Sequence, residues 1–555
     1  MSEASVSETP SVEKKSDAVA LDEIFQPFNV SDRPGLVVGI AQHGKTLYRR
    51  AFGLASVELG VANTPHTRMR IGSTTKHFTC LAALLLAEEG KLDLDVSVRT
   101  YLPELSVLKG EPTLRQLMSH TSGYRDYLDV GFMAEGMAIK PRGVALQTQL
   151  RQREVNFAPG EMMIYNNGGY HLLSLVIERI GGMPFESFLK ERIFTPLGMI
   201  DTESVPSDFI ITRGAAALHW PLPDGSFRRG ILPTEEMLGE GAIVSTIDDM
   251  LLWLAHLRGP KTIGSENSWQ QLVTPARLNN GLVTTYALGL HVHSYRGVDV
   301  IHHGGSVFGG SSQMITVPAH GLDIIIIANG IPDSVEKLAD TVIDTLLGDD
   351  VLGAAAVTAD GVRFKSMMGT RYYAPDSGLT VGFADADGKL GLVLNNFGPW
   401  PLCDEGESLQ MSFEDTAVGP FVIDTSALAT EGAAPTKLEV REGGNVHRME
   451  LLPELASPLS EVGQALVGRY RAADLDADAR IAFDGDVLKL DIFGKWGVNL
   501  LVLEAFSADV FGAQGIEPFP PFGVSLTVER KQGQVTALRV DSWRTRRMLF
   551  ERVGD

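Results

Sequence analysis

A change of pattern near residue 350 constrains the fold of this 555-residue chain more than any other feature. Before that point, apolar residues recur both at helical spacing and in alternating runs. After it, helical periodicity fades, and short alternating segments separated by Gly, Asp and Asn take over. Alternation with a period of two is typical of strands that bury one face. The chain therefore combines a mixed helix-and-strand region with a C-terminal region built from strands.

The first region predicts strands at both ends and helices between them. Residues 35–42 and 45–53 form an expected hairpin that turns at His43-Gly44. Residues 73–89 carry apolar residues at helical spacing and end at Gly90. Further segments are helices at 169–180, 184–192 and 247–257, and strands at 286–293, 298–303, 312–318 and 322–328. Early and late strands around a helical middle indicate an α+β fold with an antiparallel sheet, rather than alternating βαβ units.

The C-terminal region contains a weak internal repeat. The segment GTRYYAPDSGLTVGFADADGKLGLVL from Gly369 resembles GRYRAADLDADARIAFDGDVLKLDI from Gly468, which begins about 99 residues later. Such similarity indicates two copies of one supersecondary unit. We therefore predict two small antiparallel β domains, separated near the LLPELASPLSE stretch. The predicted organisation is a flexible tail at 1–20, an α+β domain at 21–350, and β domains at 351–455 and 456–555.

Composition excludes several functional classes. The chain has 48 Lys+Arg against 69 Asp+Glu and a formal charge of -21, so a basic face for nucleic acid or anionic membranes is not expected. Its two cysteines can form neither a disulfide framework nor a four-thiolate metal site. The N-terminus lacks an apolar signal core, and the longest apolar runs are too short to span a membrane. We expect a soluble, cytoplasmic protein.

Ser73 and Lys76 form a Ser-x-x-Lys pattern with a possible use in nucleophilic catalysis. The chain contains four other such patterns, but only Ser73 follows a predicted strand and opens a long apolar helix. Residues three apart share a helix face, and the first amides of a helix are free to hold an oxyanion. A serine hydroxyl needs a neighbouring base, and a lysine is one only when its pKa is depressed. The alternative is a simple helix cap beside a solvated lysine.

Tyr165-Asn166-Asn167 is the second element, expected on a loop between Pro159-Gly160 and an apolar helix. A phenol can relay a proton, and the neighbouring amide can donate to a substrate carbonyl. The alternative is a turn made by Asn-Asn-Gly-Gly beside a packed tyrosine.

His302-His303-Gly304-Gly305 is the third element, at the end of the predicted strand VDVIHH. Paired glycines allow another backbone or a substrate to approach closely, and the amide of Ser306 could then serve as a second oxyanion donor. A histidine beside a lysine could help to keep that lysine neutral. The alternative is a glycine-rich strand end with a histidine satisfied by its neighbours.

In this order, the three elements resemble the serine β-lactamase and D,D-peptidase superfamily, whose first signature is Ser-x-x-Lys. The His-Gly-Gly element is similar to the class C-like branch. Across the whole chain the resemblance is to the D-aminopeptidases, which carry a catalytic domain followed by two small antiparallel β-barrels. Supporting phrases are RMRIGSTTKHFTC at 68–80, SHTSG at 119–123, SGYRDY at 122–127, NFAPGEMMIYNNGGYHLLSLVIE at 156–177, RIFTPLGM at 192–199, STIDDML at 245–251, YALGLHV at 286–292 and GRYRAADLDAD at 468–478.

The resemblance implies a role for each matching residue. Ser73 would be the nucleophile and Lys76 its proton acceptor, with an acyl-enzyme intermediate and no metal or cofactor. Tyr165 and Asn167 would complete the Tyr-x-Asn element. His303 and Gly305 would form His-x-Gly, although His302 and Gly304 also fit that pattern by letter. The amides of Ser73 and Ser306 would hold the carbonyl oxygen.

The resemblance also implies a substrate and an assembly. In D-aminopeptidases a loop of the third domain reaches the active site; here the equivalent is residues 512–523, GAQGIEPFPPFG. Glu517 in that loop could bind a free N-terminal ammonium, because a desolvated charge-assisted pair is strong; the alternative is an exposed glutamate. The expected partner is a small peptide or amide substrate, with neither nucleic acid nor membrane, and the family expectation is a homodimer.

Three competing interpretations remain open at this point. The same fold could serve a carboxylic-ester hydrolase, a β-lactamase or a D,D-carboxypeptidase. His291, His293 and His302 could approach one another across a hairpin and hold a metal, although no acidic residue or cysteine completes a familiar ligand spacing. The chain could also be a binding protein whose hydrolase domain is inactive, and only a rate separates that case from an enzyme.

Overall fold

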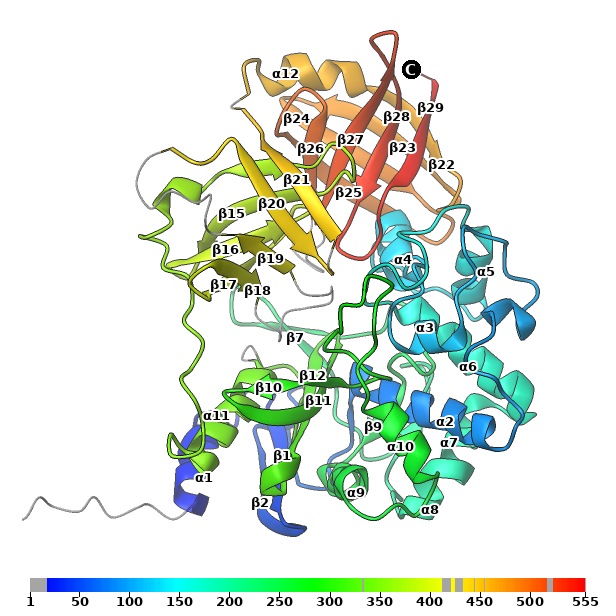
Figure 1. The fold of residues 1–555 in the computed structure, drawn as a ribbon, viewed down its shortest axis with the longest axis vertical. Coiled ribbons are helices and arrows are strands. Elements are labelled where there is room, and N and C mark those ends of the chain that lie inside the picture. The colour runs from blue at the N-terminus through cyan, green and yellow to red at the C-terminus, as the bar shows by residue number, and fades with distance from the viewer. Residues whose placement is uncertain are drawn as a thin grey trace, which may run out of the picture.

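The structure is a computed structural model that describes residues 17–331, 334–411, 421–424, 433–443, 445–453, 455–516 and 523–554. A six-stranded antiparallel sheet forms the centre of the N-terminal region (Figure 1), in the order β10-β11-β12-β13-β1-β2. Its strands are β1 (Leu36–Gln42), β2 (Lys45–Phe52), β10 (His291–Tyr295), β11 (Val298–Val307), β12 (Gly310–Val317) and β13 (Leu322–Ala328). The early hairpin therefore pairs with a late strand, which confirms the predicted α+β sheet.

Helices cover both faces of this sheet. On one face, α1 (Asp17–Phe25) and α11 (Val335–Leu347) pack against alternate apolar residues of the strands. On the other face, α2 (Lys76–Glu88), α6 (Asn167–Gly181) and α9 (Ile247–Arg258) share one large core with the sheet. The remaining helices are α3 (Leu114–Met118), α4 (Tyr127–Glu135), α5 (Val144–Arg151), α7 (Phe185–Leu189), which continues as a π-helical turn (Lys190–Phe194), α8 (Thr195–Leu197), α10 (Glu266–Leu272) and α12 (Leu459–Val462). The four predicted helices are thus confirmed.

The predicted strand at 286–293 is misplaced. Strand β10 begins only at His291, and the residues before it form a turn in which Tyr286 is fully buried. Gly289 has a φ of +77°, and a Cβ at this position would lie 2.7 Å from the backbone nitrogen of His77. The turn is therefore pressed against the helix that carries Lys76. This tertiary contact outweighs the strand propensity of the segment.

The C-terminal region folds as two closed, eight-stranded antiparallel barrels (Figure 1), as predicted. The repeat found in the sequence corresponds to the first three strands of each barrel. The domain boundaries at 350/351 and 455/456 stay predictions. The first barrel contains β14 (Arg371–Tyr373), β15 (Thr380–Ala386), β16 (Lys389–Leu394), β17 (Phe397–Asp404), β18 (Ser408–Met411), β19 (Phe421–Asp424), β20 (Lys437–Glu442) and β21 (Asn445–Leu451). The second contains β22 (Gly468–Ala472), β23 (Ala477–Asp484), β24 (Val487–Phe493), β25 (Val498–Ala505), β26 (Val510–Gly515), β27 (Gly523–Lys531), β28 (Gln534–Asp541) and β29 (Met548–Gly554).

The short strands complete the N-terminal region. They form small sheets beside the central one and are β3 (Leu54–Ser56), β4 (Val61–Ala62), β5 (Met69–Arg70), β6 (Glu203–Ser204), β7 (His219–Pro221), β8 (Phe227–Arg229) and β9 (Ile243–Ser245). Strand β5 leads directly into the turn that carries Ser73. No described helix is both long and apolar enough to cross a bilayer.

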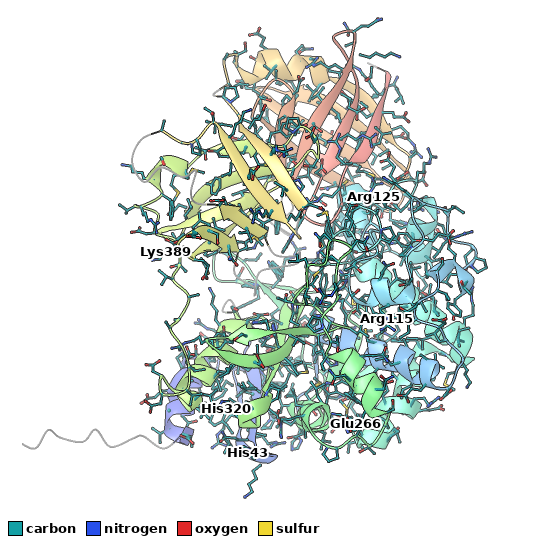
Figure 2. The ribbon with its side chains drawn as sticks, viewed as in Figure 1. His43, Arg115, Arg125, Glu266, His320 and Lys389 are labelled. Carbon is teal, nitrogen blue, oxygen red and sulfur yellow. The ribbon has the colours of Figure 1, made fainter. Side chains whose placement is uncertain are left out.

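The second barrel packs on α4 of the first domain. Val130 and Met133 of α4 belong to the core of this barrel. Arg125, labelled in Figure 2 where the two parts meet, has a fully buried side chain and an ion pair of 2.8 Å with Asp474. Such a buried, paired charge is costly to break, because the partner would be left uncompensated. The interface therefore fixes the second barrel next to the residues described below.

Candidate active site

Ser73 lies on a 3-10 turn, Gly72–Thr75, immediately before α2 begins at Lys76. Side chains tie this turn to the central sheet: the Thr74 hydroxyl donates to the His303 carbonyl at 3.0 Å, and the Ser312 hydroxyl donates to the Ile71 carbonyl at 2.8 Å. The predicted arrangement of strand, serine and apolar helix is therefore confirmed. Helical spacing then places Ser73 and Lys76 on one face.

Lys76 is the central polar group of the site, and its side chain is completely buried. Its Nζ lies 3.0 Å from Ser73 Oγ, 2.9 Å from Asn167 Oδ1 and 2.7 Å from the carbonyl oxygen of Glu240. A neutral amine has two N–H groups, which match the Asn167 and Glu240 acceptors and leave the lone pair for Ser73. These three contacts orient the lone pair of a neutral Lys76 toward the serine hydroxyl.

Burial lowers the pKa of Lys76 to about 7, from an ordinary value of 10.5. The Glu240 carboxylate opposes this lowering, whereas the Arg544 guanidinium adds to it. Glu240 is itself held as a carboxylate: burial alone would raise its pKa, but His171, 3.2 Å away, and the Tyr127 hydroxyl, 2.6 Å away, keep it below the ordinary value. Lys76 is therefore poised to exchange a proton near neutral pH.

Tyr165 lies on the loop that precedes α6, as predicted, and Asn166 caps that helix by accepting a hydrogen bond from Gly169 N. Lys76 Nζ is 4.6 Å from the centre of the Tyr165 ring. The Tyr165 hydroxyl has no hydrogen-bond partner of standard geometry among the described residues, although Ser73 is near enough to lower its pKa. Burial is the larger influence and raises the pKa of Tyr165. A neutral phenol that relays protons fits this environment better than a phenolate.

The His-Gly-Gly strand lies against the Ser73 turn. A Cβ on Gly305 would lie 1.8 Å from the Ile71 carbonyl oxygen, so only glycine permits this approach. A Cβ on Gly72 would lie 2.8 Å from Ser306 N, which makes the amides of Ser73 and Ser306 close neighbours. These contacts are what an oxyanion site between the two amides requires.

The structure separates the two histidines of β11. His303 lies on the Tyr165 side, with ring centres 6.2 Å apart, and its Nε2 is 2.9 Å from the Tyr286 hydroxyl. His302 instead contacts His293, at 2.9 Å between their Nε2 atoms. Successive strand residues face opposite sides of a sheet, which explains the division. Burial and the nearby Lys76 hold the pKa of His303 well below its ordinary range.

Ser73, Asn167 and Ser306 open into one cavity of about 350 Å³. Its walls are largely apolar, and they include Phe132, Trp220, Phe308, Phe397 and Trp543. Three charged residues line the cavity, each from a different part of the chain: Asp129 from α4, Glu240 from the segment before β9, and Arg544 from the second barrel. Ser73 therefore faces a small chamber that the first domain and both barrels build together.

Similarity to known proteins identifies the family of this chain. The sequence matches the beta-lactamase family over residues 21–376, well over half of the chain. The chain belongs to the beta-lactamase family. The D-aminopeptidase of Brucella canis is 26% identical over 538 residues, which cover 94% of this chain and 96% of the relative.

Solved structures extend the fold comparison. An octameric penicillin-binding protein homologue from Pyrococcus abyssi covers 95% of this chain and 98% of its own, with a TM-score of 0.52 and 18% identity. The D-amino acid amidase from Ochrobactrum anthropi SV3 covers 59% of this chain and 97% of its own, with a TM-score of 0.50 and 23% identity. At these identities, the two structures establish the fold alone.

Several residues of this beta-lactamase family site lie outside the three motifs that predicted it. Asp126 accepts hydrogen bonds from the backbone and side-chain nitrogens of Asn167, at 3.1 and 3.0 Å. Asp129 accepts one from the Ser542 hydroxyl, and burial raises the pKa of Asp129. These acids and Arg544 are single charged residues outside any motif. Only Asp126 had a local signal, since it caps α4 by accepting from Leu128 N.

Two expectations about further ligands end differently. Glu517 lies outside the described residues, so its predicted ammonium contact stays a prediction. For the metal alternative, no group of three or more His, Cys, Asp or Glu residues in the described part of the chain is placed to hold an ion. His293 and His302 contact each other instead.

Proposed function

We propose that this protein is a serine D-aminopeptidase, which removes N-terminal D-residues from small peptides and amides through an acyl-enzyme on Ser73. The observation that carries the proposal is the 3.0 Å contact between Ser73 Oγ and Lys76 Nζ, a buried lysine whose pKa falls to about 7. The similarity to a D-aminopeptidase over 94% of the chain, barrels included, supports the substrate class.

The first step forms the acyl-enzyme. Neutral Lys76 takes the proton of Ser73, and Ser73 Oγ attacks the carbonyl carbon of the scissile amide. The negative charge that develops on the carbonyl oxygen is stabilised by the amides of Ser73 and Ser306, which the close packing at Gly72 and Gly305 brings together.

The second step expels the amine and the third regenerates the enzyme. The proton held on Lys76 passes through the Tyr165 hydroxyl to the leaving nitrogen as the C–N bond breaks. Lys76, neutral again, then takes a proton from water, whose oxygen attacks the ester. Collapse of that intermediate returns the proton to Ser73 and releases the acid. The transfer through Tyr165 requires a neutral hydroxyl, in agreement with the raised pKa of Tyr165.

Asp129 supports an aminopeptidase over a simple esterase. Its carboxylate is the acidic side chain that α4 contributes to the cavity wall, among apolar neighbours where an ion pair is strengthened. A free α-ammonium group of the substrate is the matching cation. The Glu517 carboxylate, predicted from sequence, is a second acceptor in this proposal.

Hydrolysis of D- and L-alanine p-nitroanilide and of a simple p-nitrophenyl ester tests the proposal. We expect the D-anilide to be cleaved faster than the L-anilide, and Ser73→Ala to abolish the reaction while the unfolding midpoint stays unchanged. Ester turnover without D-anilide cleavage would indicate a carboxylic-ester hydrolase on the same fold. No Ser73-dependent turnover of any substrate would favour a binding protein.

We also propose a cytoplasmic, homodimeric protein. A chain of this length with only two cysteines fits a reducing compartment. Cell fractionation tests the location. Light scattering on the purified protein tests the assembly: a dimer supports the proposal, and an octamer, the state of the Pyrococcus abyssi homologue, contradicts it.

A further inference from the structure

Arg544 brings the second barrel into the active site. It lies in the connection between β28 and β29 and lines the cavity that contains Ser73. Two hydrogen bonds to Asn156 of the first domain fix this connection: the Asn156 side chain donates to the Arg544 carbonyl and accepts from Arg546 N, both at 2.8 Å. The position of Arg544 is therefore built into the interface.

The donors of the Arg544 guanidinium are unused within the described part of the chain. Its side chain is only 26% exposed, yet none of its N–H groups makes a hydrogen bond there, and Nε is buried without an acceptor. The nearest carboxylate is that of Asp126, at 3.6 Å, beyond hydrogen-bond distance. The Asp126 oxygens already accept from Leu128 N and from two nitrogens of Asn167.

Aromatic rings hold the guanidinium without using its donors. Its central carbon lies 4.9 Å from the ring centre of Tyr165 and 5.4 Å from that of Trp543. Ring faces attract the cation but accept no in-plane N–H bond. A planar, fork-shaped donor in this state matches a carboxylate, which it can bind through two parallel hydrogen bonds.

The location of Tyr165 indicates which carboxylate. In the proposed function, which this inference extends, the Tyr165 hydroxyl delivers the proton to the leaving nitrogen. In a dipeptide, the carbon of the terminal carboxylate is two bonds from that nitrogen, so the carboxylate must lie close to Tyr165. Arg544 packs on the ring of the same tyrosine.

We propose that Arg544 binds the terminal carboxylate of the leaving residue, so that the preferred substrates are dipeptides with a D-residue first and a free carboxyl end. The site is then complementary to a zwitterion, with Asp129 for the ammonium group and Arg544 for the carboxylate. Larger peptides and simple amides lack a carboxylate at this distance.

D-alanylglycine and D-alanylglycinamide form a matched pair that differs only in the terminal charge. Their kcat/KM values are measured with wild type, Arg544→Gln, Arg544→Lys and, as a control, Arg480→Gln on an exposed strand of the same barrel. The wild type and the control should favour the free acid by about 10- to 100-fold, the range expected of a charge-assisted contact. Arg544→Gln should bring the ratio close to one, and Arg544→Lys should give an intermediate value because it keeps the charge without the fork.

The ratio separates binding from any general effect of Arg544 on Lys76, since such an effect changes both substrates equally. A ratio near one in the wild type, or a ratio that survives Arg544→Gln, overturns the carboxylate site. Failure of the wild type to cleave D-alanine p-nitroanilide as well as both dipeptides contradicts the proposed function itself, and the carboxylate site falls with it. Thermal unfolding of each variant confirms that the fold is retained.

Discussion

The two sides of the active-site cavity differ in how completely their polar groups are satisfied. On the first-domain side, Lys76 Nζ contacts Ser73 Oγ, Asn167 Oδ1 and the Glu240 carbonyl oxygen, all within 3.0 Å. On the barrel side, the guanidinium of Arg544 makes no hydrogen bond to any described residue. A polar network whose hydrogen bonds are all formed is rigid, whereas a buried donor without an acceptor costs free energy that a bound ligand can recover. In the proposed function, the first domain carries out the chemistry and the barrel side that faces it selects the substrate.

The largest effect is expected when Lys76, on the first-domain side of the cavity, is replaced. Lys76→Met should lower kcat/KM by at least about 10⁴-fold for every substrate, because the nucleophile loses its base. The matched control is Lys140→Met, since Lys140 is also buried with a lowered pKa but donates to the Gly136 carbonyl, away from Ser73. Equal losses in both variants would show that burial of a lysine, rather than its contact with Ser73, is what matters.

The pH dependence of kcat/KM should report Lys76 directly. The base acts when neutral, and its pKa is lowered to about 7, so the rate should rise with pH up to about 7 and then level off. His303 cannot produce this limb, because its pKa is held well below its ordinary range. Arg544→Gln should move the limb to higher pH, and Glu240→Gln should move it to lower pH. A rate that keeps rising toward pH 10 would mean that Lys76 titrates normally.

Asp129 should affect only substrates that carry an ammonium group. Asp129→Asn should slow cleavage of D-alanine p-nitroanilide by about 10- to 100-fold, the worth of one charge-assisted contact. Propionyl p-nitroanilide, which lacks the amine, should change little. Glu517→Gln tested in parallel decides whether the sequence-predicted acceptor shares this role. An equal loss on both anilides would show that Asp129 affects the reaction itself rather than the binding of the ammonium group.

Glu442 should have the smallest effect on the reaction and a large one on stability. Its carboxylate forms a buried ion pair of 2.8 Å with Arg546, two residues from Arg544. Glu442→Gln leaves that charge unpaired, which costs about 3–5 kcal/mol of unfolding free energy in such cases. Glu450→Gln, which removes an exposed pair with Lys437, should cost less than about 1 kcal/mol. Urea unfolding distinguishes the two variants, and equal midpoints would remove Glu442 from this account.

The same pair predicts a pH dependence of stability. Burial alone would raise the pKa of Glu442, but Arg546 and His447 hold it below its ordinary value. Its contribution is therefore present above the unfolded pKa and is lost as the pH falls through the folded pKa. The stability difference between wild type and Glu442→Gln should shrink on acidification.

The first-domain residues of the site could be predicted from sequence because they stand in short motifs with fixed local geometry. Ser73 and Lys76 share one helix face, and Tyr165 precedes a helix that its neighbour caps. The letters alone fit both His302 and His303; the resemblance favoured His303, and the register of β11 places His303 on the Tyr165 side and His302 against His293. Arg544 was missed because it is one arginine in a hairpin connection, and its approach to Tyr165 depends on how the barrel docks.

The fold shows the same division between local and tertiary information. Alternation and the repeat predicted two β domains, and these are closed barrels. Residues 286–290 were misassigned as strand because their contact with His77 is made across a long sequence separation. Equivalent connections of the two barrels also diverge: that between β20 and β21 is short, whereas that between β28 and β29 contributes residues 542–544 to the cavity wall. One repeated unit has thus acquired two roles.

Rapid quenching during turnover of a D-alanyl ester, followed by mass spectrometry of the intact and digested protein, tests the central claim most directly. The account predicts a transient mass increase equal to one D-alanyl group, located on the peptide that contains Ser73 and absent in Ser73→Ala. Turnover of the ester by the wild type with no adduct at any quench time, or an adduct on another residue, would contradict it.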